Sequence, residues 1–187
     1  MGAPGRTEQV IGTLPMAFSF PAQEYPVMLD ACMAYASFGV LKEKMDKNEP
    51  VPPYWGFDAE GKPTTDPHEM AKGTRLPIGG HKGFALAILG EVLTALLSQG
   101  CIVDEEDAIN GQSAPTSHTA IAIKADALMP LDEFRGRTCE LVERMEARAP
   151  GLHVPGERSF QVQQSMEQAG IVSLKDSLLD ELDMLSD

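Results

Sequence analysis

Basic residues are scarce in this sequence of 187 residues. Fifteen lysines and arginines stand against 28 aspartates and glutamates, which gives a formal net charge of -13 at pH 7. Binding to a nucleic-acid backbone depends on neutralising its phosphates with lysine and arginine, and no basic stripe is present along this chain. The charge balance therefore predicts that nucleic acid is not a partner.

Cysteine is also sparse, and its spacing excludes the usual sulfur sites. Cys32, Cys101 and Cys139 are far apart, with no CxxC pair that would indicate zinc or a redox-active disulfide. Reduced thiols in a cytosolic protein are the simplest interpretation. The histidines lack metal-ligand spacing as well, so we predict no metal site; they are His68, His81, His118 and His153.

No hydrophobic run is long enough to cross a bilayer. The most apolar stretch, residues 84–97, is interrupted by Glu91 and is shorter than the roughly 20 residues that a spanning helix needs. The first residues lack the apolar core of a secretory signal, and Arg6 stands where a myristoylation motif has serine or threonine. These features predict a cytoplasmic protein without a membrane partner.

A hydrophobic fraction of 43% is enough for one domain with a sizeable core, or for one domain and part of a second. Strands alternate with helices, which predicts the α/β class, with a mixed sheet flanked by helices. We expect strands at 16–20, 26–30 and 118–126, a long loop at 46–73, and helices at 31–45, 83–99, 131–150, 160–169 and 174–185.

The helix opened by Gly83 carries bulky apolar residues at helical spacing, which predicts one buried face; they are Leu89, Val92, Leu93, Leu96 and Leu97. Gly100 is a natural end for this helix. Small residues at Ala85, Ala87 and Gly90 would let it approach a neighbouring element closely.

The stretch "LPIGGHKG", residues 76–83, is the strongest candidate for chemistry. Two glycines permit a bend with exposed N–H groups, a helix start adds partial positive charge, and Lys82 adds a full charge. Together these favour a seat for phosphate or carboxylate. The alternative is a tight turn with a solvated Lys82 and with His81 serving as a cap rather than as an acid–base group.

Two further charged positions have open interpretations. Asp30 follows an apolar stretch, where its carboxylate would bind a ligand hydroxyl or backbone amides, or would serve as a helix N-cap. In "PGER", residues 155–158, Arg158 would bind a phosphate or carboxylate through two N–H groups, or would simply lie at the end of a solvated loop.

Several stretches in order resemble the malate/L-lactate dehydrogenase family, whose members lack a conventional Rossmann fold. The matching text is "GTLPMAFSFP", "VMLDACMAYASFGVL", "VPPYWGFDAEGKPTTDP", "LPIGGHKGFALAILGEVLTALLSQG", "SHTAIAIKAD", and "VPGERS" followed by "AGI". These motifs run from Ile11 to about Leu185, so the resemblance covers nearly the whole chain. It implies a non-Rossmann dinucleotide-binding architecture.

The resemblance also implies an activity and a set of binding residues. Family members are NAD- or NADP-dependent oxidoreductases that act between 2-oxo and 2-hydroxy acids, usually as homodimers. Three separated segments are expected to hold the cofactor; they are Pro26, Val27, Met28, Leu29, Asp30, Ala31 and Cys32, then His81 and Lys82, then Gly156, Glu157 and Arg158. Residues 1–130 would then be the cofactor-binding domain, and residues 131–187 a helical segment.

This sequence departs from the family pattern at Leu14, where asparagine is common, at Cys32, where serine is usual, and at Ala85, where a second glycine often follows the KG pair. Family members also carry an N-terminal region with the histidine that protonates the substrate carbonyl, and none of the histidines here inherits that role. We therefore expect the C-terminal, cofactor-binding part of an oxidoreductase, whose remaining portion is missing from this sequence or supplied by another polypeptide. The expected partner is a second copy or a complementary N-terminal chain. The alternatives are a non-catalytic relative that binds dinucleotide or only dimerises, and a remnant that does not fold.

Overall fold

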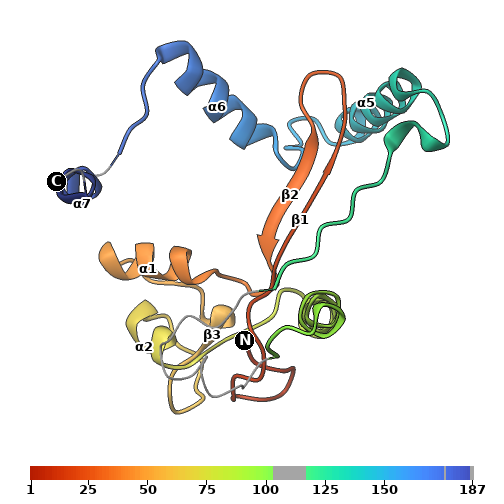
Figure 1. Cartoon of the computed structure of the whole chain (residues 1–187). Helices are drawn as coiled ribbons and strands as arrows, with labels where there is room; N and C mark the ends of the chain where they lie inside the picture. Colours follow the sequence, from red (N-terminus) through yellow and green to blue (C-terminus); the bar gives the residue numbers. More distant parts are fainter. Residues whose placement is uncertain (103–116, 175, 186–187) are drawn as a thin grey trace. The chain divides into compact units, whose positions relative to one another are not determined.

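The computed structural model describes residues 1–102, 117–174 and 176–185 (Figure 1). The chain forms two compact units, and each unit is built from two stretches of sequence. The first unit comprises residues 1–18 and 30–123, and the second comprises residues 19–29 and 124–187.

Helices and short strands make up both units. Strands β1 (Pro15–Phe20) and β2 (Val27–Cys32) confirm the two predicted strands. They pair with each other, and each passes from one unit into the other. The first unit continues with α1 (Phe38–Asp46), η1 (Pro53–Trp55), β3 (Gly56–Phe57), α2 (Pro67–Lys72), β4 (Thr74–Arg75), α3 (His81–Glu91) and the π-helical turn η2 (Val92–Leu96). The second contains η3 (Ala125–Ala127), α5 (Leu131–Arg148), α6 (Glu157–Ala169) and α7 (Asp176–Leu185).

The fold is of mixed α/β type, but the expected mixed sheet is not found among the described residues. Their named strands form two separate two-stranded sheets, β1–β2 and β3–β4. The second is antiparallel, with Gly56 opposite Arg75 and Phe57 opposite Thr74.

Ser37 determines where α1 begins. Its backbone is extended, and its Oγ accepts a hydrogen bond from the N–H of Val40 at 3.2 Å, which satisfies one of the donors left free at a helix start. The prediction of a helix from residue 31 is therefore wrong at its N-terminal end. The N-cap interpretation of Asp30 is also wrong, because Asp30 lies within β2.

Residues 46–73 are not the long loop that we expected from their composition. They contain η1, β3 and α2, and the last of these is set by the Asp66–Pro67 pair. The Oδ1 atom of Asp66 accepts a hydrogen bond from the N–H of His68 at 2.8 Å, and proline at the first helical position loses no hydrogen bond. Helix α2 buries Met70 in a small core with Leu41 and Val51.

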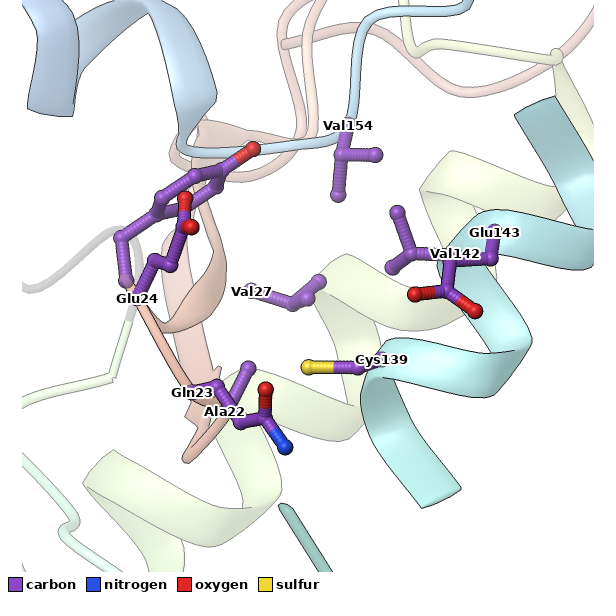
Figure 2. Close-up of a pocket in the computed structure, with 9 residues that line it drawn as sticks. Ala22, Gln23, Glu24, Val27, Cys139, Val142, Glu143 and Val154 are labelled. Carbon is purple, nitrogen blue, oxygen red and sulfur yellow. The ribbon is translucent and has the colours of Figure 1, made fainter. Parts of the chain in front are cut away.

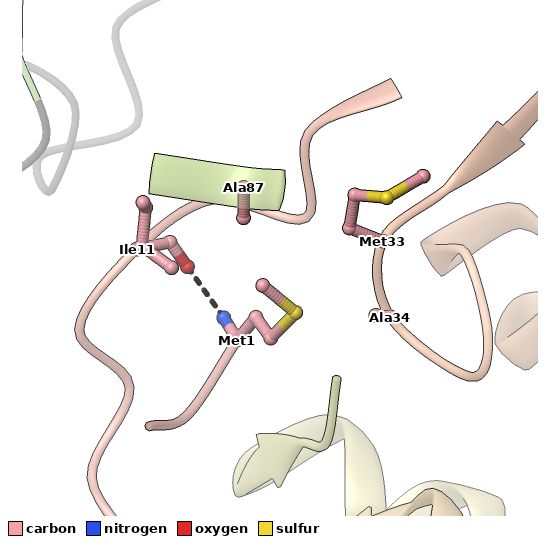
Figure 3. Packing of buried hydrophobic residues seen from close by; sticks show 5 residues of the cluster. All are labelled: Met1, Ile11, Met33, Ala34 and Ala87. Atoms are coloured by element: carbon pink, nitrogen blue, oxygen red, sulfur yellow. Dashed lines mark hydrogen bonds between the residues drawn. The ribbon is translucent and has the colours of Figure 1, made fainter. Parts of the chain in front are cut away.

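The main core of the first unit combines residues that are far apart along the chain. Met1, Ile11, Met33, Ala34 and Ala87 form it, and the side chain of Met1 is fully buried (Figure 3). The α-ammonium group of Met1 donates a hydrogen bond to the carbonyl oxygen of Ile11. The chain start is thereby held within the core rather than left at the surface.

Helix α3 buries its small residues and exposes its large ones, which is the reverse of the predicted face. Gly83, Ala87 and Gly90 are buried, whereas Leu89 is 49% exposed and Leu97 is 71% exposed. Close approach explains this orientation: a Cβ atom at Gly90 would lie 2.0 Å from Cδ2 of Leu14, so the backbone packs directly on that side chain. The other leucines of the predicted buried face are exposed or only partly buried.

The predicted strand at residues 118–126 is wrong. Residues 117–124 pair with no described strand, and Ile121 and Ile123 are 73% and 86% exposed. The predicted helix from Leu131 is confirmed as α5. The two C-terminal helices are confirmed with shifted starts, because α6 begins at Glu157 and α7 at Asp176.

Candidate functional site

The first unit brings the end of β2 next to the segment that leads into α3. The N–H of Ile78 donates to the carbonyl oxygen of Met33 at 2.9 Å, and the N–H of Tyr35 donates to that of Leu76 at 2.9 Å. Cys32 packs against the main core together with Ile78. Two of the predicted cofactor-binding segments, 30–32 and 81–82, therefore belong to one packed region of the first unit.

The bend at residues 79–83 has the backbone geometry that its glycines predict. Gly79 and Gly80 have φ angles of 57° and 62°, a region that other residues rarely adopt. A Cβ atom at Gly80 would meet nothing within 4 Å, so the space beside this backbone is open. A ligand can approach the bend without a clash with the protein.

The N–H groups of this bend are less available than the sequence suggested. The amides of Gly80, Lys82 and Gly83 each donate to a carbonyl of the preceding turn, at 3.1, 3.3 and 3.0 Å. Helix α3 also has no side-chain cap. Any anion at this helix start is therefore bound mainly through charged side chains rather than through a cradle of free amides.

Lys82 is the cation at this position. Both His81 and Lys82 are exposed in the first turn of α3. Lys82 forms no ion pair with any carboxylate in the part of the chain that the structure describes. Among the described residues, Lys82 is therefore an exposed cation that no carboxylate neutralises.

The second unit joins residues 26–29, the first part of the predicted 26–32 segment, to the predicted segment at 156–158. The N–H of Met28 donates to the carbonyl oxygen of Pro155 at 3.0 Å. Gly156 has a φ angle of 96°, and a Cβ atom there would lie 2.7 Å from Cγ of Met28 and 3.3 Å from the carbonyl oxygen of Pro26. Residues 26–28 and 155–156 therefore touch, and only glycine fits at position 156.

Glu157 and Arg158 have different environments at the start of α6. The Oε2 atom of Glu157 accepts a hydrogen bond from the N–H of Val154 at 3.2 Å, and the Nδ1 atom of His153 lies 3.6 Å from it. Glu157 therefore stabilises the turn at residues 154–157. Arg158 is exposed and forms no ion pair with a carboxylate of the described residues.

No sequence pattern indicates that Tyr25 lines a cavity of about 230 Å³ within the second unit. Figure 2 labels other residues of this lining, among them Glu24, Val27 and Cys139. The ring of Tyr25 stacks on Phe160 with a centroid separation of 5.0 Å. Burial raises the pKa of Tyr25, and the carboxylates of Glu157 and Glu24 raise it further. Glu24 and Glu143 both line the cavity, so its electrostatics disfavour an anionic ligand.

Among the described residues, no group of three or more histidine, cysteine, aspartate or glutamate side chains is placed to hold a metal ion. No helix in the same part of the chain has the length and apolar character needed to cross a membrane.

Comparison with known proteins shows the family. Residues 1–183 match the family model described as malate/L-lactate dehydrogenase. The chain is 33% identical over 185 residues to a malate/(S)-sulfolactate dehydrogenase from Methanothermus fervidus, covering 95% of this chain and 53% of the relative. It is 33% identical over 183 residues to a Δ1-pyrroline-2-carboxylate/Δ1-piperideine-2-carboxylate reductase from Pseudomonas putida, covering 93% and 52%.

A solved structure agrees with these matches. The Δ1-piperideine-2-carboxylate reductase from Pseudomonas syringae pvar. tomato superposes with a TM-score of 0.83 at 28% identity, covering 97% of this chain and 55% of that one. The protein thus belongs to the malate/L-lactate dehydrogenase family. It spans about half the length of the relatives that it matches.

Proposed function

We propose that this chain is the NAD- or NADP-binding part of an oxidoreductase that interconverts 2-oxo and 2-hydroxy acids, or the related cyclic imino acids. Family membership supports this reaction class, because the relatives are named as dehydrogenases of malate and sulfolactate and as reductases of Δ1-pyrroline-2-carboxylate. The observation that carries the proposal is the exposed Lys82, unpaired among the described residues, beside the open glycine bend.

The residues present fit an anionic dinucleotide. Lys82 supplies a positive charge at the first turn of α3, and Gly79 and Gly80 leave the adjacent space open. In the second unit, taken by itself, Arg158 is an exposed cation at the start of the 13-residue helix α6, whose N-terminal end favours negative charge. When bound, the nicotinamide cofactor supplies or accepts the hydride.

The residues of this chain would bind and orient the cofactor rather than move the proton. A proton donor has to lie close to the substrate carbonyl oxygen while negative charge develops there. We propose that this donor comes from the portion of the relatives that this chain does not match. His153 is exposed and lies beside Glu157, which braces a turn, so the geometry gives it no such role.

A second candidate function is a binding module without catalysis, and the exposed apolar surface favours it. Leu96 and Leu97 are 55% and 71% exposed next to the candidate site's own helix, and such surface marks a contact with another chain. We propose a second copy or a complementary chain as the partner on this face.

Titration of the purified chain with NADH and with NADPH, followed by nicotinamide fluorescence, tests the proposal. Saturable binding is expected for at least one of them. Turnover is then measured with pyruvate, oxaloacetate and Δ1-pyrroline-2-carboxylate. Binding without turnover supports the module, binding with turnover supports a self-sufficient enzyme, and the absence of binding to either nucleotide contradicts the proposal.

A further inference from the structure

The second unit contains an apolar groove along α5, with a volume of about 520 Å³. On the α5 wall, four lining residues follow one another at intervals of four, three and four positions; they are Phe134, Thr138, Leu141 and Met145. This is the spacing of the seam by which one helix packs on another. Leu141 and Met145 are 59% and 42% exposed, so the described part of the chain leaves the seam open.

The rest of the groove is almost free of polar groups that need a partner. The hydroxyl of Thr138 donates to the carbonyl oxygen of Phe134 at 3.0 Å, so it is already satisfied. The walls facing α5 are apolar; they consist of Phe20, Val27, Met129, Val154 and Pro155. An occupant of this groove therefore has to present an apolar face.

Arg137 is the one charged residue among the described residues that line the groove. It is exposed and forms no ion pair with a described carboxylate. By contrast, Arg135 and Arg144 on the same helix pair with Asp132 and Glu140. An apolar occupant that also carries negative charge would match the groove in both respects.

Helix α7 has these properties. Leu178, Leu182 and Leu185 follow one another at intervals of four and three positions and are 41%, 47% and 83% exposed. The sequence of the helix, DSLLDELDML, has four acidic residues and no lysine or arginine. Its ten residues are about 15 Å long, and the seam from Phe134 to Met145 is about 17 Å long. The helix therefore matches the groove in spacing, length and sign of charge.

The length of the connecting chain favours a second copy as the source of α7. Helix α6 begins two residues after Pro155, which lines the groove, and its 13 residues end about 20 Å from its start. The six residues 170–175 reach at most about 20 Å when fully extended. Within one copy, α7 returns to the groove only if this segment retraces α6 at full extension. The α7 of a second copy has no such limit.

We propose that α7 of one copy docks along α5 in the groove of a second copy, and that the exchange is reciprocal. The leucines of α7 cover the open seam of α5, in the way that an amphipathic helix occupies an apolar groove, and Arg137 lies beside the acidic helix. A twofold axis relates the two contacts, so the assembly closes as a dimer. This surface lies outside the proposed cofactor contacts of the first unit and is independent of nucleotide binding.

Sedimentation velocity on a dilution series of the whole chain measures the dimer. Leu141→Gln in the groove and Leu182→Gln in α7 are each expected to raise the dissociation constant roughly tenfold, because each places an amide in the apolar seam. Arg137→Glu is expected to raise it about threefold or more, because it sets like charges together. Leu128→Gln is the control: Leu128 is 94% exposed in the same unit, does not line the groove, and is expected to change nothing.

A mixture of two full-length variants tests the exchange itself. The groove variant carries Arg137→Glu and Leu141→Gln, and the helix variant carries Leu178→Gln and Leu182→Gln. A dimer of either variant alone has no intact contact, whereas a mixed dimer pairs the intact α7 of the first with the intact groove of the second. The mixture is therefore expected to associate more tightly than either variant alone.

Several results would overturn the inference. A parent chain that stays monomeric throughout the series would show that α7 lies on its own copy or that the groove takes another occupant. A dimer that is unaffected by both Leu141→Gln and Leu182→Gln would form through a different face. A mixture that associates no more tightly than its components would exclude the exchange. If Leu141→Gln fails to melt cooperatively, the exposed Arg137→Glu and Leu182→Gln decide the outcome.

Discussion

The α-ammonium group of Met1 donates a hydrogen bond to the carbonyl oxygen of Ile11, 2.5 Å away, inside the main core of the first unit (Figure 3). Burial and, to a smaller extent, the charge of Arg75 together lower the pKa of this amine from 8.0 to about 6. A cation at this position is therefore disfavoured by its surroundings, while the neutral amine is tolerated.

This relationship predicts a pH dependence for a chain with a free amine at Met1. Between pH 6 and 8 the unfolded chain binds a proton that the folded chain has released, so the free energy of unfolding rises with pH across this window. The rise is on the order of 1 to 2 kcal/mol after allowance for solvent screening. Urea unfolding at pH 6, 7 and 8, followed by the fluorescence of Trp55, measures it. A chain acetylated at Met1 is the control, and identical profiles for the two chains would contradict the assignment.

Lys82→Ala is expected to weaken NADH binding about tenfold, because it removes a charge-assisted hydrogen bond to an anionic ligand. The melting temperature should not change, since Lys82 is exposed and forms no ion pair with a described carboxylate. Lys72→Ala is the matched control: Lys72 is also exposed, but its ammonium pairs with Glu69 at 2.7 Å. Equal NADH affinity in both variants would exclude Lys82 from the site.

Gly156→Ala is expected to lower the free energy of unfolding by about 1–3 kcal/mol, because the added Cβ strains a φ angle of 96° and collides with Met28. Gly136→Ala is the opposite case, in the middle of α5 with nothing within 4 Å of the new atom. That substitution should stabilise the protein by about 0.5–1 kcal/mol through helix propensity. Chemical denaturation compares the two, and a shared sign would refute the explanation.

A third pair of substitutions tests which face of α3 is buried, together with the helical residues 92–98 that continue it. Ala87 is fully buried, so Ala87→Leu should overpack the main core and lower the free energy of unfolding by about 1–3 kcal/mol. Leu97 is 71% exposed, so Leu97→Gln should change stability by less than about 0.5 kcal/mol. Thermal melts at low protein concentration give the comparison. A larger loss of unfolding free energy for Leu97→Gln than for Ala87→Leu would instead support burial of the leucine face that the sequence predicts.

Local signals predicted the elements that depend on local interactions. The start of α5 at Leu131 follows a proline and has acidic residues in its first turn, and both features are visible in the sequence. Strands β1 and β2 were predicted because they are apolar stretches bounded by turn residues. The wrong prediction of a strand at residues 118–126 has a different origin. Residues 118–126 have a strand-like pattern, but a strand requires a partner, and no described strand pairs with residues 117–124.

Helix α3 shows how one sequence can have two plausible buried faces. The large leucines form one stripe, while Gly83, Ala87 and Gly90 form another at helical spacing. Close packing of the backbone on Leu14 favours burial of the small residues, whereas the sequence indicates only that these residues permit such an approach. The cavity lined by Tyr25 could not be predicted from the sequence, because its other lining residues include Cys139 and Val154, which are distant along the chain.

The chain passes between its two units at residues 18/19, 29/30 and 123/124. Neither unit can therefore be produced from one uninterrupted stretch of the gene. A shortened version that ends at residue 123 would keep residues 19–29 without the helices that complete their unit. Isolating the second unit requires residues 19–29 to be joined to the segment from residue 124 onward by an engineered link, and limited proteolysis at any single one of these points would leave a fragment of one unit attached to the other.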